Sequence, residues 1–361
     1  MTRLAPAAFH HRMVSWPFTS AQLTAGLRRY LGDTTVQLLE IREEPLKVAH
    51  AVGLIRGVGV DLERAGHRES YSYLLKEPQR TTLYGLAGIG RREVGLYRTL
   101  ATQIPFPVPE LVTGDPGGSW LLLEPYPTTV EPEQWSAEDY RQAVINLAHL
   151  HDRFWCLSED LSVFPWIGRP LTNDFDVYVL AAAKALDTIM QQGSPEVITG
   201  SAHRLNTLGR LVSQADVVSQ VLQSRPQTLL HGDYWPGNIS IDEDARQVVY
   251  DWQTVCVGPG VMDLVVFINN SLWWFSPLPI DPADLIAAYR AEITTRTGET
   301  WTDTDWECQW DFALMWHFLQ DWLVALAAPP AITGNIHYHL LEEVWLEPVV
   351  RAADRWLKQL Q

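Results

Sequence analysis

The spacing of apolar residues changes part-way along this chain of 361 residues, and the change limits the folds open to it. Stretches 36–41, 54–62 and 70–76 have the composition of strands and are separated by turn-rich segments, which predicts a small antiparallel sheet. Beyond a stretch rich in Pro and Thr, apolar residues recur mainly at helical spacing. We therefore expect an α+β fold of two lobes. A small N-terminal lobe, residues 1–127, is built on the sheet, and a larger C-terminal lobe, residues 128–361, is mainly helical.

Helices are expected in both lobes. A first short helix begins at Thr19 or Ser20, either of which is a suitable N-cap, and ends near Tyr30. Ser136 and Asp139 form the pattern of a capping box at the start of a C-terminal helix. Further helical patterns cover about residues 91–103, 174–192, 196–223 and 262–361, the last interrupted at 277–282 and 329–334. Short strands are expected at 120–123, at 228–230 and on either side of 242–246.

Composition and charge exclude several classes of protein. Hydrophobic residues make up 47% of the chain, enough to bury a large core and too many for a disordered protein. The formal net charge of −16 argues against nucleic acid or an anionic membrane as the main partner, because both are bound through Lys and Arg. The three cysteines fit neither a disulfide framework nor a metal site, and the uncharged runs are poor membrane spans. A soluble, cytoplasmic protein is therefore expected.

One segment carries a specific arrangement of polar residues. His231, Asp233 and Asn238 form the pattern H-x-D-x-x-x-x-N, and a predicted hairpin separates them from Asp251. Phosphoryl transfer requires the protein mainly to position a base and the metal ions that neutralise phosphate charge. An aspartate on a tight loop, such as Asp233, can accept the proton of an attacking hydroxyl group. Asn238 and Asp251 offer oxygen ligands of the kind that Mg²⁺ prefers.

Two residues upstream complete this arrangement. Lys76 ends a predicted strand and Glu93 lies in the following helix, and kinases use such a pair to hold the phosphates of the nucleotide. Taken separately, Asp233, Asn238 and Asp251 could be turn residues, and Lys76 with Glu93 a surface ion pair. Those explanations account neither for the spacing nor for the presence of both sets in one chain. We therefore favour the functional interpretation.

At these residues the chain resembles the aminoglycoside phosphotransferase and choline kinase family, a branch of the protein-kinase-like fold. The resemblance spans roughly residues 36–267 and rests on Lys76, residues 92–98, residues 147–151, residues 231–238 and residues 251–253. It implies a bilobal protein-kinase-like fold with ATP or GTP bound between the lobes. It also implies that Asp233 is the catalytic base, that Asn238 and Asp251 bind Mg²⁺, and that Lys76 and Glu93 belong to the nucleotide site.

The resemblance implies further roles around the nucleotide. The segment from Glu124 to Tyr126 would be the hinge that contacts the nucleobase through its backbone. His231 and Asp263 would brace the catalytic loop without taking part in catalysis. The family usually places a Gly- or Ser-rich loop over the phosphates, whereas residues 48–53 contain a single glycine. The Walker A pattern is absent from the sequence, which excludes a P-loop NTPase.

The chain has 16 tryptophans, many of them among acidic residues near its C-terminal end. Helical spacing predicts that most of them pack between helices. A minority facing the cleft could combine with carboxylates to bind an ammonium group. The candidates for this contact with substrate are Asp311, Asp321, Trp273 and Trp316. His149 and His151, on different faces of one predicted helix, are assigned a structural or surface role.

These observations favour an ATP-dependent small-molecule kinase that transfers the γ-phosphate to a substrate hydroxyl. An aminoglycoside-like or other cationic compound is the expected acceptor, and antibiotic inactivation would be one use of the reaction. Two alternatives stay open: a choline-kinase-like metabolic alcohol kinase and a catalytically silent nucleotide-binding protein. A protein kinase is disfavoured, because Asp263 follows Asp251 closely and no A-P-E segment is present, which leaves little room to dock a peptide. The sequence does not indicate the oligomeric state.

Overall fold

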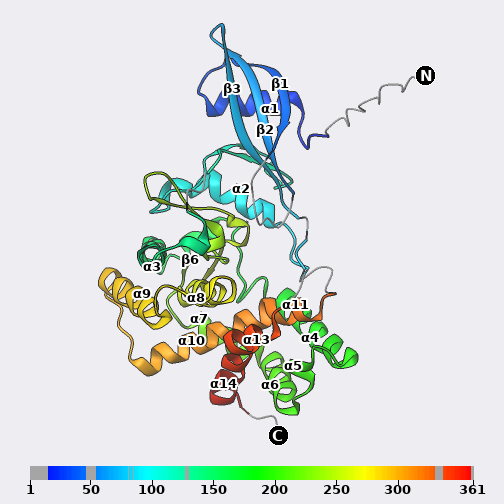
Figure 1. Ribbon diagram of the computed structural model, residues 1–361, viewed down its shortest axis with the longest axis vertical. Coiled ribbons are helices and arrows are strands. Elements are labelled where there is room, and N and C mark those ends of the chain that lie inside the picture. Colours follow the sequence, from blue (N-terminus) through cyan, green and yellow to red (C-terminus); the bar gives the residue numbers. More distant parts are fainter. Residues whose placement is uncertain are drawn as a thin grey trace, which may run out of the picture.

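The computed structural model of the chain describes residues 15–45, 54–79, 81–83, 85–126, 130–329 and 336–358. A sheet with one helix forms one end of the molecule, and a larger helical body forms the rest (Figure 1). The loop at 48–53, the expected lobe boundary at 127/128 and most of the expected break at 329–334 lie outside the described residues. In the part of the chain that is described, no helix combines the length and the apolar character that a membrane crossing needs.

The N-terminal lobe is built on a five-stranded antiparallel sheet. Its strands are β1 (Gln37–Glu44), β2 (Leu54–Arg64), β3 (His67–Glu77), β4 (Leu111–Gly114) and β5 (Leu121–Leu123), in the order β1-β2-β3-β5-β4. The four predicted strands of this lobe are confirmed. Strand β4 was not predicted, because a run of four residues is too short to show a clear alternation.

Side-chain alternation divides β3 between two environments. Leu75 packs in a core formed with α1 (Ser20–Tyr30), whereas Leu74 packs on the opposite face with α2 (Ile89–Thr99). Successive residues of a strand point to opposite faces of the sheet, so Lys76 shares the face of Leu74. The alternation of the sequence thereby brings Lys76 to the side of the sheet that carries α2.

Helix α2 lies between the sheet and the helical body (Figure 1). It begins after Gly88, which has the left-handed conformation at φ 78° that glycine adopts without strain. The short turn η1 (Ala101–Gln103) follows it, so the predicted helix at 91–103 is two pieces. On its other side α2 packs against the turn η5 (Trp252–Thr254), which follows Asp251. One helix therefore contacts both halves of the predicted site.

The C-terminal lobe is mainly helical. Its α-helices are α3 (Ala137–Arg153), α4 (Phe175–Gln192), α5 (Glu196–Thr199), α6 (Ala202–Ser213), α7 (Ala215–Gln223), α8 (Val261–Phe275), α9 (Pro282–Thr297), α10 (Asp303–His317), α11 (Leu323–Ala327), α13 (Tyr338–Leu340) and α14 (Glu347–Trp356). Two π-helical segments are η6 (Phe318–Trp322) and η7 (Leu341–Leu346), and short turns are η2 (Pro132–Gln134), η3 (Asp160–Val163) and η4 (Pro236–Asn238). Strand β6 (Thr228–Leu230) pairs with β9 (Cys256–Gly258), and β7 (Ile239–Ile241) forms a hairpin with β8 (Gln247–Val249).

The helices begin at the predicted capping residues, but some of them are shorter than predicted. Thr19 caps α1 and Ser136 caps α3, each in a capping box. The single long helix expected at 196–223 is three helices, interrupted at Gly200 and Gln214, because its apolar spacing continues across both breaks. The hairpin flanking 242–246 is confirmed.

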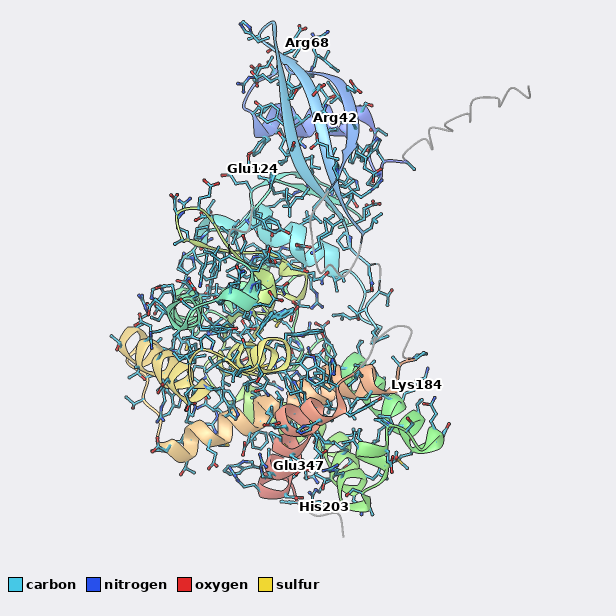
Figure 2. The ribbon with its side chains drawn as sticks, in the orientation of Figure 1. Arg42, Arg68, Glu124, Lys184, His203 and Glu347 are labelled. Atoms are coloured by element: carbon cyan, nitrogen blue, oxygen red, sulfur yellow. The ribbon has the colours of Figure 1, made fainter. Side chains whose placement is uncertain are left out.

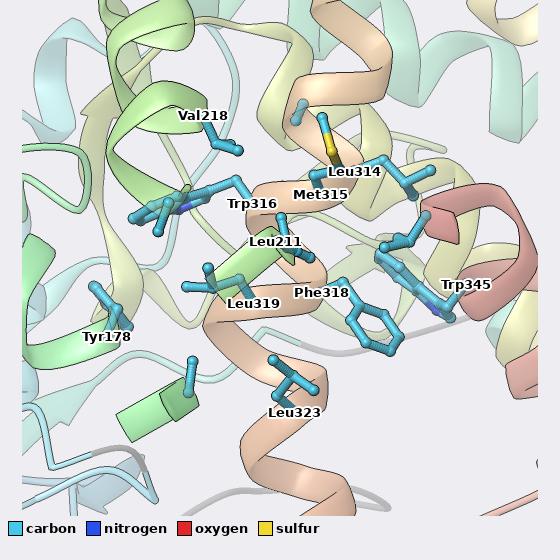
Figure 3. Packing of buried hydrophobic residues seen from close by; sticks show 14 of the residues in the cluster. Tyr178, Leu211, Val218, Leu314, Met315, Trp316, Phe318, Leu319, Leu323 and Trp345 are labelled. Atoms are coloured by element: carbon cyan, nitrogen blue, oxygen red, sulfur yellow. The ribbon is translucent and has the colours of Figure 1, made fainter. Parts of the chain in front are cut away.

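Most tryptophans are part of the packing, as the helical spacing predicts. Figure 3 shows Trp316, Phe318 and Trp345 among aliphatic side chains in the core of the C-terminal lobe. All 16 tryptophans lie within the described residues, and only Trp274 is exposed, with 58% of its surface accessible. The excess of tryptophan is therefore mostly core, with one clear exception.

Candidate active site

The buried carboxylate of Asp263 holds the loop that carries Asp233 through two backbone hydrogen bonds. Strand β6 ends at Leu230, and the next two backbone N–H groups, of His231 and Gly232, donate to Asp263 Oδ2 and Oδ1 at 2.7 and 2.9 Å. Gly232 has φ 85°, and a Cβ atom there would collide with the carbonyl oxygen of Thr254. The tight turn therefore requires glycine at this position.

His231 fixes the other side of the loop. Its Nε2 donates to the carbonyl oxygen of Tyr250 at 2.9 Å, which leaves Nδ1 to accept the backbone N–H of Asp233 at 3.2 Å. Burial lowers the pKa of His231, so the neutral ring that this pattern requires is favoured. His231 and Asp263 thus lie beneath the loop, the placement that a bracing role needs.

His151 supports the same carboxylate. Its Nε2 lies 3.4 Å from Asp263 Oδ2, and its Nδ1 lies 2.7 Å from the hydroxyl of Tyr289. Burial alone would raise the pKa of Asp263, but hydrogen bonding to His151 and the charge of that residue hold it below its usual value. His151 was expected to have a structural or surface role, and it is fully buried in the last turn of α3. Its position in the helix alone gives no signal of the contact with Asp263.

Asp233 and Asn238 are joined by two hydrogen bonds within the loop. The amide Nδ2 of Asn238 donates to the backbone oxygen of Asp233 at 2.8 Å and to its Oδ2 at 2.9 Å. A side-chain hydrogen bond from Trp235 also reaches Asp233. Burial and the charge of Asp251, with a smaller contribution from Asp321, raise the pKa of Asp233 to about 7. Asp233 therefore sits in surroundings that favour its taking up a proton.

Lys76 joins the two lobes at this point. Its Nζ lies 2.8 Å from Glu93 Oε2 on α2 and 2.7 Å from Asp251 Oδ1. Lys76 is 4% exposed and Glu93 is fully buried. Burial disfavours the ammonium group, but the charges of Asp251 and Glu93 outweigh that effect and raise the pKa of Lys76. Asp251 has a left-handed backbone with φ 63°, an uncommon conformation for a residue other than glycine that often marks a functional position.

The structure thus brings together five of the predicted site residues from distant parts of the sequence: Lys76, Glu93, Asp233, Asn238 and Asp251. The sheet supplies the lysine, α2 the glutamate, and the loops around β7 and β8 the remainder.

The predicted hinge lies directly after β5. Figure 2 shows Glu124 at the base of the sheet, where the small lobe meets the rest of the molecule. Its carboxylate accepts a hydrogen bond from Tyr30 of α1, and its backbone N–H donates to the carbonyl oxygen of Glu110 at 2.9 Å. The ring of Tyr126 stacks on Tyr250 with 4.4 Å between centroids. Both side chains and the backbone N–H of Glu124 are thus engaged with protein.

The four predicted substrate residues separate into two groups. Asp311 accepts hydrogen bonds from Trp356 Nε1 at 2.7 Å and Arg355 at 3.0 Å, and Trp316 is fully buried in the core. The structure therefore places both in the packing of α10 and not beside Asp233. Trp273 is 8% exposed and packs on Trp322, whereas Asp321 is partly exposed and interacts electrostatically with Asp233.

Three aromatic residues at the site were missed by the sequence analysis. The ring of Trp235 stacks with those of Trp274 and Phe275, at 6.0 Å between centroids in each case. The available signal was that Trp235 lies only two positions after Asp233.

Helix α2 is tied to the C-terminal lobe by a second ion pair next to Glu93. Arg92, which is 7% exposed, donates to Asp174 Oδ2 at 2.9 Å, and the backbone N–H of Arg169 donates to the same oxygen at 2.8 Å. The pair fixes the helix that presents Glu93 to Lys76.

Replacing Asp174 with alanine should lower the free energy of unfolding by about 1–3 kcal/mol, because a buried guanidinium group loses its charged partner. The KM for nucleotide should rise as well, since Glu93 loses its fixed position. Urea unfolding and steady-state kinetics measure the two effects. The control is Asp187→Ala, at an exposed position in α4, the helix that follows Asp174. Unchanged values for Asp174→Ala would remove this role.

Comparison with known proteins now identifies the family. The sequence model of the phosphotransferase enzyme family, APH, matches residues 64–302, which contain all five clustered residues. The chain belongs to this family. Among curated proteins, none is significantly similar to the sequence.

Solved structures share the fold of this family member at low sequence identity. A putative aminoglycoside phosphotransferase from Ralstonia eutropha is 16% identical with a TM-score of 0.58, and the match covers 95% of this chain and 100% of that one. The streptomycin–ATP ternary complex of APH(2″)-IIa is 14% identical with a TM-score of 0.51, covering 93% and 99%. The choline kinase LicA from Streptococcus pneumoniae is 12% identical with a TM-score of 0.50, covering 89% and 95%. The chain therefore has the bilobal, protein-kinase-like fold of these enzymes.

Proposed function

We propose that this phosphotransferase is an ATP-dependent small-molecule kinase, which transfers the γ-phosphate to a hydroxyl group of its substrate. The observation that carries the proposal is that acidic residues of both lobes contact the side chain of Lys76. One ammonium group contacts Glu93 from the small lobe and Asp251 from the large lobe, beside the pair of Asp233 and Asn238. ATP as the nucleotide is supported by the ternary complex of similar fold that contains it.

Each residue of the cluster has a role in this reaction. Asp233 accepts the proton of the attacking hydroxyl, and its raised pKa suits a group that takes up a proton near neutral pH. Lys76, oriented by Glu93, binds the phosphates of the nucleotide. The segment from Glu124 to Tyr126 contacts the nucleobase through its backbone.

The donor set beside Asp233 fits Mg²⁺. The side chains of Asn238 and Asp251 offer oxygen atoms, and Mg²⁺ is usually held by one or two protein ligands together with substrate phosphates. Asn238 and Asp251 would hold the ion, which would neutralise the charge of the phosphates.

The acceptor in this proposal is a cationic compound, aminoglycoside-like or otherwise. A choline-kinase-like alcohol kinase is the second candidate, supported by the choline kinase of similar fold. A catalytically silent nucleotide-binding protein is the third, and the complete set of five residues argues against it. The chain reaches α8 soon after Asp251, which leaves little room for a peptide substrate. Cys156, Cys256 and Cys308 are free, which suits a reducing cytoplasm.

Replacing Asp251 with alanine should abolish Mg²⁺-dependent binding of ATP, because the site loses its carboxylate ligand and its contact with Lys76. Titration calorimetry with and without Mg²⁺ measures this loss. Asp244→Ala, at an exposed turn position between β7 and β8, is the matched control and should bind as the unaltered protein does. Retention of metal-dependent binding by Asp251→Ala would remove the role assigned to this residue.

A further inference from the structure

We propose that Tyr97 is a positioning residue of the nucleotide site, and that its hydroxyl group donates a hydrogen bond to the carboxylate of Glu93 when ATP and Mg²⁺ are bound. Tyr97 acts on the nucleotide through Glu93, which in turn orients Lys76. This inference rests on the proposed kinase function and adds to it a residue that keeps the ion pair of Lys76 and Glu93 in place while the phosphates are held.

The position of Tyr97 follows from the helix that carries it. Tyr97 lies four residues after Glu93 in α2, and residues at this spacing are neighbours on one face of a helix. Long side chains in helices lean toward the N-terminal end, which here directs the tyrosine ring over the turn that holds Glu93. Both side chains are buried, with 7% of Tyr97 and none of Glu93 exposed. The phenol and the carboxylate therefore share one buried environment.

The hydroxyl group of Tyr97 is a donor that this structure leaves unpaired. Its oxygen is buried and, within the described residues, has no hydrogen-bond partner. Buried polar groups are nearly always paired, because an unpaired one destabilises the folded state. Burial raises the pKa of Tyr97, and the nearby charge of Glu93 raises it further, so the hydroxyl group keeps its proton. Tyr97 thus retains a hydrogen bond that it can donate.

The carboxylate of Glu93 has an oxygen able to accept this hydrogen bond. Its Oε1 accepts from Lys76 Nζ at 3.0 Å. Its Oε2 lies 2.8 Å from the same nitrogen but, in the described part of the chain, makes no hydrogen bond of suitable geometry. Burial raises the pKa of Glu93, and Lys76 and the backbone N–H of Trp252 oppose this effect. Oε2 is therefore the atom that can take a further donor.

Nucleotide binding changes the surroundings of Glu93. In this structure the ammonium group of Lys76 is shared between Glu93 and Asp251, at 2.8 and 2.7 Å. Under the proposed function Lys76 also holds phosphates, so Glu93 receives a smaller share of the positive charge. A buried carboxylate that loses part of its countercharge is destabilised unless another donor reaches it. The hydroxyl group of Tyr97, on the same face of α2, is such a donor.

Tyr73 provides a close comparison within the same lobe. It lies on β3, is buried, and also has a hydroxyl oxygen without a partner among the described residues. Its ring packs in the core formed with α1, whereas Tyr97 packs in the core on the other face of the sheet. The two tyrosines therefore carry the same unpaired group, and only that of Tyr97 lies beside Glu93.

The experiment measures thermal unfolding of the full-length protein with and without ATP and Mg²⁺, and binding of ATP by calorimetry. Tyr97→Phe removes only the hydroxyl group. Without ATP this variant should have the Tm of the unaltered protein or a higher one, because an unpaired buried hydroxyl group is gone. Its affinity for ATP with Mg²⁺ should fall about tenfold, as for the loss of one hydrogen bond to a charged group, and ATP should raise its Tm less.

Two further variants separate this role from general packing. Tyr73→Phe should have the same effect on the Tm without ATP and should bind ATP as the unaltered protein does. Glu93→Met has no acceptor oxygen at this position, so adding Tyr97→Phe to it should weaken ATP binding no further.

The outcomes distinguish this role from the proposed function. A lower Tm of Tyr97→Phe without ATP, together with unchanged ATP affinity, would show that Tyr97 only supports packing. A tenfold loss of affinity that persists in the Glu93→Met background would show that Tyr97 does not act through Glu93. Either result would overturn the inference while the unaltered protein still bound ATP. Failure of the unaltered protein to bind ATP with Mg²⁺ would instead overturn the proposed function.

Discussion

Replacing Asp233 with asparagine should lower kcat by about 10²–10⁴-fold, the range over which a positioned base accelerates proton transfer. The asparagine side chain has nearly the same shape but cannot take the proton of the attacking hydroxyl. Because Lys76 and Asp251 are untouched, nucleotide should still bind. Acceptor-dependent formation of ADP gives the rate, and calorimetry with ATP and Mg²⁺ gives the affinity.

The matched control for this prediction is Asp244→Asn, at an exposed position in the turn between β7 and β8. It should leave both quantities unchanged. A rate for Asp233→Asn within a few-fold of the unaltered protein would show that another group accepts the proton.

Replacing Lys76 with methionine should lower the free energy of unfolding by about 3–5 kcal/mol, the usual effect of removing one partner from a buried ion pair. The ammonium group contacts both Glu93 and Asp251, and its removal leaves two carboxylates close together without a countercharge. Protonation relieves that repulsion, so the loss of stability should become smaller as the pH falls. Urea unfolding at several pH values measures the effect.

Two further variants make this prediction specific. Lys76→Met combined with Glu93→Gln should recover much of the lost stability, because one of the two unpaired charges is gone. Lys184→Met, at the exposed lysine labelled on α4 in Figure 2, should unfold as the unaltered protein does. If Lys76→Met unfolds at the same urea concentration as Lys184→Met, the buried ion pair does not stabilise the fold as described.

The order of helices and strands, and the five residues proposed to bind nucleotide and metal, could be predicted because each depends on a local sequence pattern. Alternation places Lys76 on one face of β3, and the spacing of Asp233 and Asn238 is compatible with one tight loop. The resemblance to a known family then supplies the assembly of these pieces. Strands β4 and β9 were not predicted, because the strands with which they pair are set by tertiary structure and not by the local sequence.

The acceptor side could not be predicted in the same way. Asp311 and Asp321 lie on one continuous run of helix, and the sequence treats them alike. Only the fold shows that Arg355 and Trp356, from the far end of the chain, hydrogen-bond to Asp311. In the described part of the chain, Asp321 instead contacts His317 and Gln320. Likewise, Trp273 and Trp274 are neighbours in sequence, and only packing decides which of them is buried.

The measurement that tests the central claim most directly is mass spectrometry of candidate alcohols after incubation with the protein, ATP and Mg²⁺. The panel should include aminoglycosides, choline and aromatic amino alcohols. The account predicts that at least one alcohol gains a phosphoryl group in the presence of the unaltered protein and that Asp233→Asn lowers the rate of this gain by about 10²–10⁴-fold. Equal phosphorylation by the two proteins would contradict the assigned mechanism, and failure of the unaltered protein to bind ATP with Mg²⁺ at millimolar concentration would contradict the kinase function itself.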